Sequence, residues 1–165
     1  MTSKADMNTQ KTRERLFSAL SFGSAIVIIG VVFVLAQPNN LWDSIMSFFN
    51  NLTFRSLPYN IISLPAPANP GAHAVLYTAA FQFSIGIGVL QVVLLALRLI
   101  LGSSIDKTAE TLGNIVYWFG AAYVVTVFLS GSPNITQYFM FWAGILVMAG
   151  LSLVARGLVL LAKRM

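Results

Sequence analysis

The sequence predicts an all-α integral membrane protein, a four-helix bundle with a short amphipathic interfacial helix in its outer loop. Acidic and basic residues are absent from three long stretches, which lie between Arg15 and Asp43, between Arg55 and Arg98, and between Glu110 and Arg156. Hydrophobic residues make up 57% of the chain and charged residues only 9%, against about 25% charged residues in soluble domains. Together these observations place most of the chain in lipid.

The charge-free stretches contain four apolar segments that are long enough to cross a bilayer, because a membrane-spanning helix needs roughly 20 apolar residues. We predict spans at residues 16–36, 73–101, 111–129 and 137–162. The other long segments, a tail of residues 1–15 and an outer loop of residues 38–72, are too short to form an independent core. Residues 1–165 are therefore expected to form a single membrane domain.

The basic residues predict the orientation of the spans. Only Arg55 lies in the outer loop. The other nine of the ten lie in the tail, beside the turn between the second and third spans, or near the end of the fourth span: Lys4, Lys11, Arg13, Arg15, Arg98, Lys107, Arg156, Lys163 and Arg164. This is the positive-inside pattern of a multi-pass cell membrane protein with both termini in the cytoplasm. Topology thus explains the net charge of +5, and no nucleic-acid partner is expected.

Residues 41–52 of the outer loop have the pattern of a short amphipathic helix. Its outer interfacial surface is predicted to comprise Trp42, Ile45, Phe48 and Phe49. Because twelve residues cannot cross a bilayer, the helix is expected to lie flat in the interface of the outer leaflet. The next segment, residues 57–70, contains four prolines and is predicted to be extended.

The second span carries a stripe of polar residues at intervals of seven: Tyr77, Ser84, Gln91 and Arg98. This spacing places them on one helix face, which is expected to point toward the other helices. In the simpler interpretation they form hydrogen bonds between packed helices. In the functional interpretation this polar seam is a path or a ligand seat.

Arg156 lies about 10 Å inside the end of the fourth span, since six apolar or small residues separate it from Lys163. An arginine at that depth either extends its head group to the interface or pairs with an acid. Glu110 and Asp106, at the start of the third span, are the predicted partners of an intramembrane ion pair. Recognition of a lipid phosphate or an anionic substrate is the functional alternative.

Several kinds of chemistry lack the residues that they need. The chain has no cysteine, which excludes disulfides, thiolate metal sites and iron–sulfur clusters. His73 is the only histidine, so one chain cannot supply two axial histidines to a haem. No catalytic constellation is visible within the spans, and we expect no cofactor and no enzyme activity. Asn51 and Asn134 each begin an N-glycosylation pattern, which is too common by chance to identify a modified site.

Three apolar runs carry a resemblance to a known family. They are Ile115-Val116-Tyr117-Trp118-Phe119-Gly120-Ala121-Ala122-Tyr123, then Phe139-Met140-Phe141-Trp142-Ala143, then Leu151-Ser152-Leu153-Val154-Ala155-Arg156. With these runs the chain resembles an uncharacterised family of small archaeal four-span integral membrane proteins. The resemblance implies the four-span fold over most of the chain, and it transfers no activity and no site residue.

The sequence therefore favours a non-catalytic assembly or accessory subunit of a membrane complex. Its expected partners are the lipid bilayer and either other membrane protein subunits or further copies of the chain. A transporter or channel component is one alternative, although the spans contain no acid to couple to protons or cations. A lipid- or quinone-binding subunit of a membrane enzyme is another, and it would need a pocket that joins His73 and Tyr77.

Overall fold

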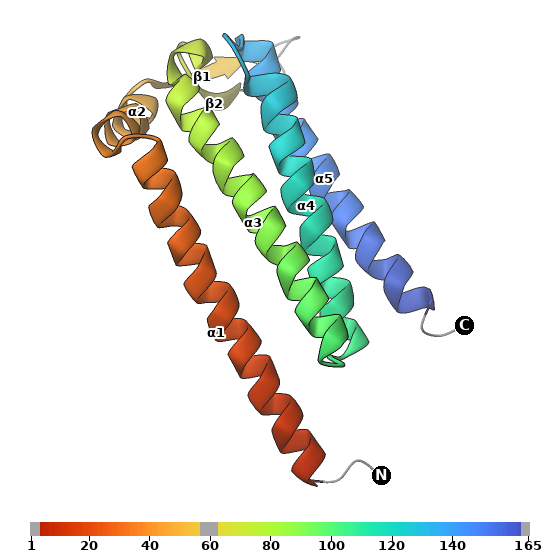
Figure 1. The fold of residues 1–165 in the computed structure, drawn as a ribbon. Helices are drawn as coiled ribbons and strands as arrows, with labels where there is room; N and C mark the ends of the chain where they lie inside the picture. Colours follow the sequence, from red (N-terminus) through yellow and green to blue (C-terminus); the bar gives the residue numbers. More distant parts are fainter. Residues whose placement is uncertain (1–3, 57–62, 163–165) are drawn as a thin grey trace.

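The computed structural model describes residues 4–56 and 63–162. Within these residues the chain forms five α-helices, two β-strands and one 3₁₀-helix (Figure 1). In chain order they are α1 (Lys4–Leu35), α2 (Pro38–Asn50), β1 (Leu52–Ser56), β2 (Ser63–Pro67), η1 (Pro70–His73), α3 (Ala74–Ile100), α4 (Ile105–Leu129) and α5 (Ile135–Ala162). Lys163 and Arg164 lie outside the described residues, as do the side chains of Lys4, Lys11 and Arg13.

Among the described residues, four helical segments are long and apolar enough to cross a membrane, as the sequence predicts. They are Arg15–Leu35, Pro70–Ile100, Ile105–Leu129 and Ile135–Ala162. The start of α1, the end of α5 and the turn between α3 and α4 lie at one end of the molecule, which we call the termini end (Figure 1). The strands, α2 and the turn between α4 and α5 lie at the other end, which we call the hairpin end. This arrangement is that of a multi-pass membrane protein.

The four long helices pack as an open row in the order α1, α3, α4, α5. The closest packing joins α4 to both α3 and α5, while α1 packs mainly against α3 and the start of α2. As a result α1 and α5 are edge helices, and most of their large apolar side chains are exposed. Figure 1 shows the same order across the molecule.

The ends of the helices follow from local residues. Gln37 adopts a positive φ of 59° and is followed by Pro38, so the chain turns sharply between α1 and α2. Gly102, with φ of 65°, ends α3 in the left-handed conformation that glycine adopts readily. Asn134 and Gln137 each accept a hydrogen bond from the other's backbone N–H, at 2.9 and 2.8 Å, which caps the start of α5.

The outer loop contains a short β-hairpin in addition to the predicted helix. The helix predicted over residues 41–52 ends at Asn50, and β1 pairs with β2 as an antiparallel hairpin in which Leu52 faces Pro67 and Ser56 faces Ser63. A two-stranded sheet tolerates Pro65 and Pro67 because each strand keeps one edge free of ladder hydrogen bonds. The predicted extended segment is confirmed over residues 63–67, and residues 57–62 lie outside the described part of the chain.

Buried side chains concentrate at the hairpin end. One cluster joins the hairpin to three helices and contains Ala66, Tyr77, Val125, Leu129 and Tyr138. A second cluster contains Val32, Leu41 and Ala79 and fixes α2 against α1 and α3. The helices are thus held together most firmly where α2 and the hairpin cover them, and they are less buried toward the termini end.

Candidate functional site

A polar cavity of about 490 Å³ lies between α1, α3 and α4, on the side of the molecule toward the termini end. Its polar lining residues are Ser18, Ser21, Gln91, Arg98, Lys107, Glu110, Thr111 and Asn114. Its apolar lining residues are Phe17, Phe22, Ala25 and Leu94. Because these positions recur every three or four residues along each helix, one face of each helix forms one wall of the cavity.

Arg98, on the α3 wall, contacts both of the other walls. Its Nη1 atom donates a hydrogen bond to the backbone oxygen of Lys107 in α4. Its guanidinium carbon lies 5.5 Å from the centre of the Phe17 ring in α1, which is within the range of a cation–π interaction. The Nε atom is buried and has no hydrogen-bond partner. Arg98 therefore holds the walls together and retains unused donors.

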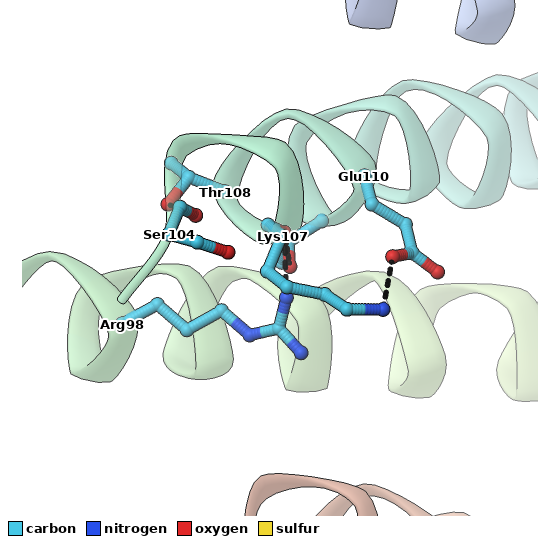
Figure 2. Close-up of polar contacts among 6 residues, drawn as sticks. Arg98, Ser104, Lys107, Thr108 and Glu110 are labelled. Carbon is cyan, nitrogen blue, oxygen red and sulfur yellow. Dashed lines mark hydrogen bonds and ion pairs between the residues drawn. The ribbon is translucent and has the colours of Figure 1, made fainter. Parts of the chain in front are cut away.

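Lys107 and Glu110 form an ion pair in which Nζ lies 2.9 Å from Oε2. Figure 2 shows that the side chains of Arg98 and Lys107 extend side by side toward Glu110. The Lys107 and Glu110 side chains are 47% and 41% exposed. A pair this accessible contributes on the order of 0.5 kcal/mol to stability, so its main effect is to neutralise the carboxylate on the cavity wall.

The ion pair predicted between Arg156 and Glu110 or Asp106 is not present in the structure. Glu110 pairs instead with Lys107, because residues three apart on one helix are already neighbours whereas Arg156 must reach across from α5. Arg156 nonetheless packs on α4, since its Cβ lies 3.5 Å from the position that a Cβ at Gly113 would occupy. Asp106 is exposed at the start of α4.

The polar seam of the second span does not line one continuous cavity. Gln91 and Arg98 line the polar cavity, whereas Tyr77 lines a separate cavity of about 220 Å³ at the hairpin end. Between them, the Ser84 hydroxyl donates a hydrogen bond to the Ala80 backbone oxygen of its own helix, at 2.8 Å. Only the half of the seam at the termini end therefore contributes to the candidate site.

His73 and Tyr77 are both buried but do not share the cavity at the hairpin end. The residues that line this cavity with Tyr77 come from α3 and α4 and from the residue that follows α4, and His73 is not among them. The His73 ring instead lies edge-on to Phe48, with ring centroids 5.2 Å apart. His73 thus packs α2 against the start of α3.

The predicted outer interfacial surface is divided between two faces of α2. Ile45 and Phe48 point toward the protein, where they pack on the two buried clusters. Trp42 and Phe49 are 57% and 63% exposed, and Met46 lies exposed between them. Residues at these intervals share one helix face. The outward apolar surface is therefore formed by Trp42, Met46 and Phe49.

Five polar residues of the cavity are not among the predicted site residues: Ser18 and Ser21 of α1, and Lys107, Thr111 and Asn114 of α4. Ser18 and Ser21 are three residues apart, and Asn114 follows Glu110 by four, so each pair lies on one helix face. This spacing is a sequence signal for the site, but it does not show that the two faces meet.

The lining of the cavity contains groups that can bind an anion. Among the described residues, no three histidine or carboxylate side chains gather in a way that would hold a metal ion. The lining offers cationic donors, hydroxyls and amides beside apolar groups. Such a combination complements a ligand that has both an anionic group and an apolar part. Comparison with known protein families, curated proteins and solved structures finds no match to this chain. The resemblance to small four-span membrane proteins therefore stays a prediction.

Proposed function

We propose that this protein is a non-catalytic membrane subunit that associates laterally with another membrane protein through its edge helices, α1 and α5. The observation that carries the proposal is the unequal use of glycine within the row of helices. Glycine and other small residues are enriched where membrane helices approach one another closely. In this chain some glycines fill that role inside the row, and others face open space.

Inside the row, glycines allow α3, α4 and α5 to pack closely. A Cβ at Gly88 would lie 3.2 Å from the Phe119 ring, and one at Gly113 would lie 3.0 Å from the Ser152 backbone oxygen. A Cβ at Gly144 would lie 2.7 Å from a Val124 methyl group. A larger residue at any of these positions would force its neighbour to move.

On the edge helices, four glycines have no neighbour. They are Gly23 and Gly30 of α1 and Gly150 and Gly157 of α5, where a Cβ would meet nothing within 4 Å. The members of each pair are seven residues apart and so share a helix face. A shallow cavity of about 410 Å³ surrounds Gly23. Both faces would let a helix of another protein approach closely, and dispersion contacts made at short distance stabilise helix pairs in lipid.

Affinity purification of a tagged protein from its native membranes in mild detergent tests this proposal. We expect a membrane protein to copurify with the wild type and to be lost from the Gly150→Leu variant. Leu151→Ala is the control, because Leu151 is also exposed on α5 but, as the residue next to Gly150, points about 100° away from it around the helix. Retention of the partner by Gly150→Leu and Gly23→Leu alike would overturn the proposal, and copurification of only a second, differently tagged copy would show a homo-oligomer instead.

We also propose that the protein lies in the cell membrane with both termini in the cytoplasm. The support is the distribution of charge along the chain, in which Arg55 is the one basic residue of the outer loop. Arg98 and Lys107 then lie near the cytoplasmic ends of their spans. The exposed apolar face of α2 would lie in the interface of the outer leaflet.

A further inference from the structure

The polar cavity changes in character along its length. Arg98, Lys107 and Glu110 line the part nearest the termini end. Gln91 is seven residues before Arg98 on α3 and so lies about 10 Å farther toward the hairpin end. On the α1 wall, Phe22 and Ala25 accompany this deeper part. One cavity therefore offers charged groups at one end and, at the other, the amides of Gln91 and Asn114 beside apolar groups, which matches a charged and polar head group joined to a hydrocarbon chain.

The charged part carries a net positive charge. Arg98 and Lys107 face one carboxylate, that of Glu110, and Lys107 neutralises it at 2.9 Å. Arg98 is then left without an anionic partner, and its Nε atom is buried with no acceptor. A guanidinium binds phosphate oxygens through two parallel hydrogen bonds, and a buried donor without an acceptor is costly. An anion at this place would satisfy both the charge and the donor.

The cavity is accessible from the side of the molecule that lipid would occupy. No close packing joins α1 to α4, so the two helices flank the cavity without closing it. Phe22, which lines the cavity, is 71% exposed. A second, mainly apolar cavity of about 330 Å³ shares Phe17 with the polar one and is otherwise lined by leucines. Free phosphate would use none of this apolar surface, whereas a phospholipid would use both.

We propose that this cavity binds one anionic phospholipid, with the phosphate at Arg98 and Lys107. The hydroxyls of Ser18 and Ser21 and the amide of Asn114 lie within the same cavity and supply hydrogen bonds to a polar head group. The acyl chains extend toward Phe22 and Ala25. In the orientation proposed above, the phosphate lies at the level of the cytoplasmic leaflet, where anionic lipids are enriched.

Native mass spectrometry of the full-length protein in detergent, titrated with defined lipids, tests the proposal. The probes are dioleoylphosphatidylglycerol, dioleoylphosphatidylcholine and inorganic phosphate. We expect one phosphatidylglycerol molecule to bind at least about tenfold more tightly than phosphatidylcholine, because both lipids carry the phosphate but the choline cation adds a positive charge to a site that is already net positive. We also expect excess inorganic phosphate not to displace it. Equal binding of the two lipids would overturn the proposal, and displacement by inorganic phosphate would show that the ligand is a free anion.

Three variants locate the bound lipid. Arg98→Gln should weaken phosphatidylglycerol binding roughly tenfold, and Ser21→Leu should weaken it by filling the cavity while leaving Arg98 in place. Arg55→Gln makes the same change in net charge at the hairpin end and should bind as the wild type does. Because Arg98→Gln also removes a link between α3 and α4, Ser21→Leu decides the outcome if the first variant does not fold. Wild-type affinity in Ser21→Leu, or in a folded Arg98→Gln, would place the lipid elsewhere and overturn the proposal.

Discussion

Replacement of Gly113 by alanine tests whether α4 and α5 pack as closely as the structure indicates. A Cβ at this position would lie 3.0 Å from the Ser152 backbone oxygen and 3.3 Å from the Ser152 hydroxyl oxygen. The Cβ of Arg156 would be 3.5 Å away. The nearest of these atoms belongs to the backbone of α5, so no rotation of a side chain relieves the contact. The two helices must separate by a few tenths of an ångström.

Two opposed effects determine how much Gly113→Ala changes the free energy of unfolding. An extra methyl group in a closely packed contact costs about 1–3 kcal/mol. Alanine also favours the helix over glycine by about 1 kcal/mol, which offsets part of that cost. Gly157→Ala is a matched control, because a Cβ at Gly157 would meet nothing within 4 Å and the variant gains the same helical preference. The difference in unfolding free energy between the two variants therefore isolates the packing cost, about 1–3 kcal/mol.

Equilibrium unfolding in dilute mixed micelles measures this difference. Each purified variant is titrated with a denaturing detergent, and the loss of helix is followed by circular dichroism. We expect Gly157→Ala to be at least as stable as the wild type and Gly113→Ala to be less stable than Gly157→Ala. Equal stability of the two variants would refute close packing of α4 on α5 at this level.

The remaining predictions concern orientation, charge and the outer helix. Tags at both termini should be accessible only from the cytoplasm, and a tag between β1 and β2 should be accessible only from outside. An externally accessible C-terminus would contradict the proposed orientation. In double-mutant cycles, the coupling energy between Glu110 and Lys107 should be roughly 0.5 kcal/mol, and that between Glu110 and Arg156 should be no larger. A larger coupling energy with Arg156 would show that Glu110 pairs with Arg156 of α5. In bilayers, a spin label at Phe49 should be relaxed by a lipid-soluble agent and one at Ser47 by a water-soluble agent, and equal aqueous exposure of both labels would exclude an interfacial α2.

The sequence alone predicts four long apolar helices, and the structure contains them. Each charge-free stretch is long enough for a helix to cross the hydrocarbon core of a bilayer. Charged residues are rare in such helices because burying a charge in lipid is costly. Two helix ends can also be predicted from single residues. Pro38 marks the end of α1 and Gly102 the end of α3, because the backbone preferences of proline and glycine favour a turn there. These features depend on residues that are close in the chain, and sequence patterns report such features well.

The outer loop is predictable only in part. The helical periodicity of α2 is visible in the sequence. It does not show which of the apolar residues Trp42, Ile45, Phe48 and Phe49 are buried and which are exposed. Tertiary packing separates them, because Ile45 and Phe48 meet the buried clusters while Trp42 and Phe49 do not. The hairpin likewise depends on pairing between residues more than ten positions apart, such as Leu52 with Pro67.

Only the tertiary structure decides which polar faces meet. Spacing shows that Gln91 and Arg98 share a face of α3, but the cavity exists because that face lies opposite Ser21 of α1 and Asn114 of α4. The order of the helices in the row determines this, and in lipid that order depends on the fit of side chains, not on hydrophobicity, because every apolar face is equally well solvated. Periodicity along one helix contains no information about its neighbour, so the open row and its polar cavity emerge only from the packed structure.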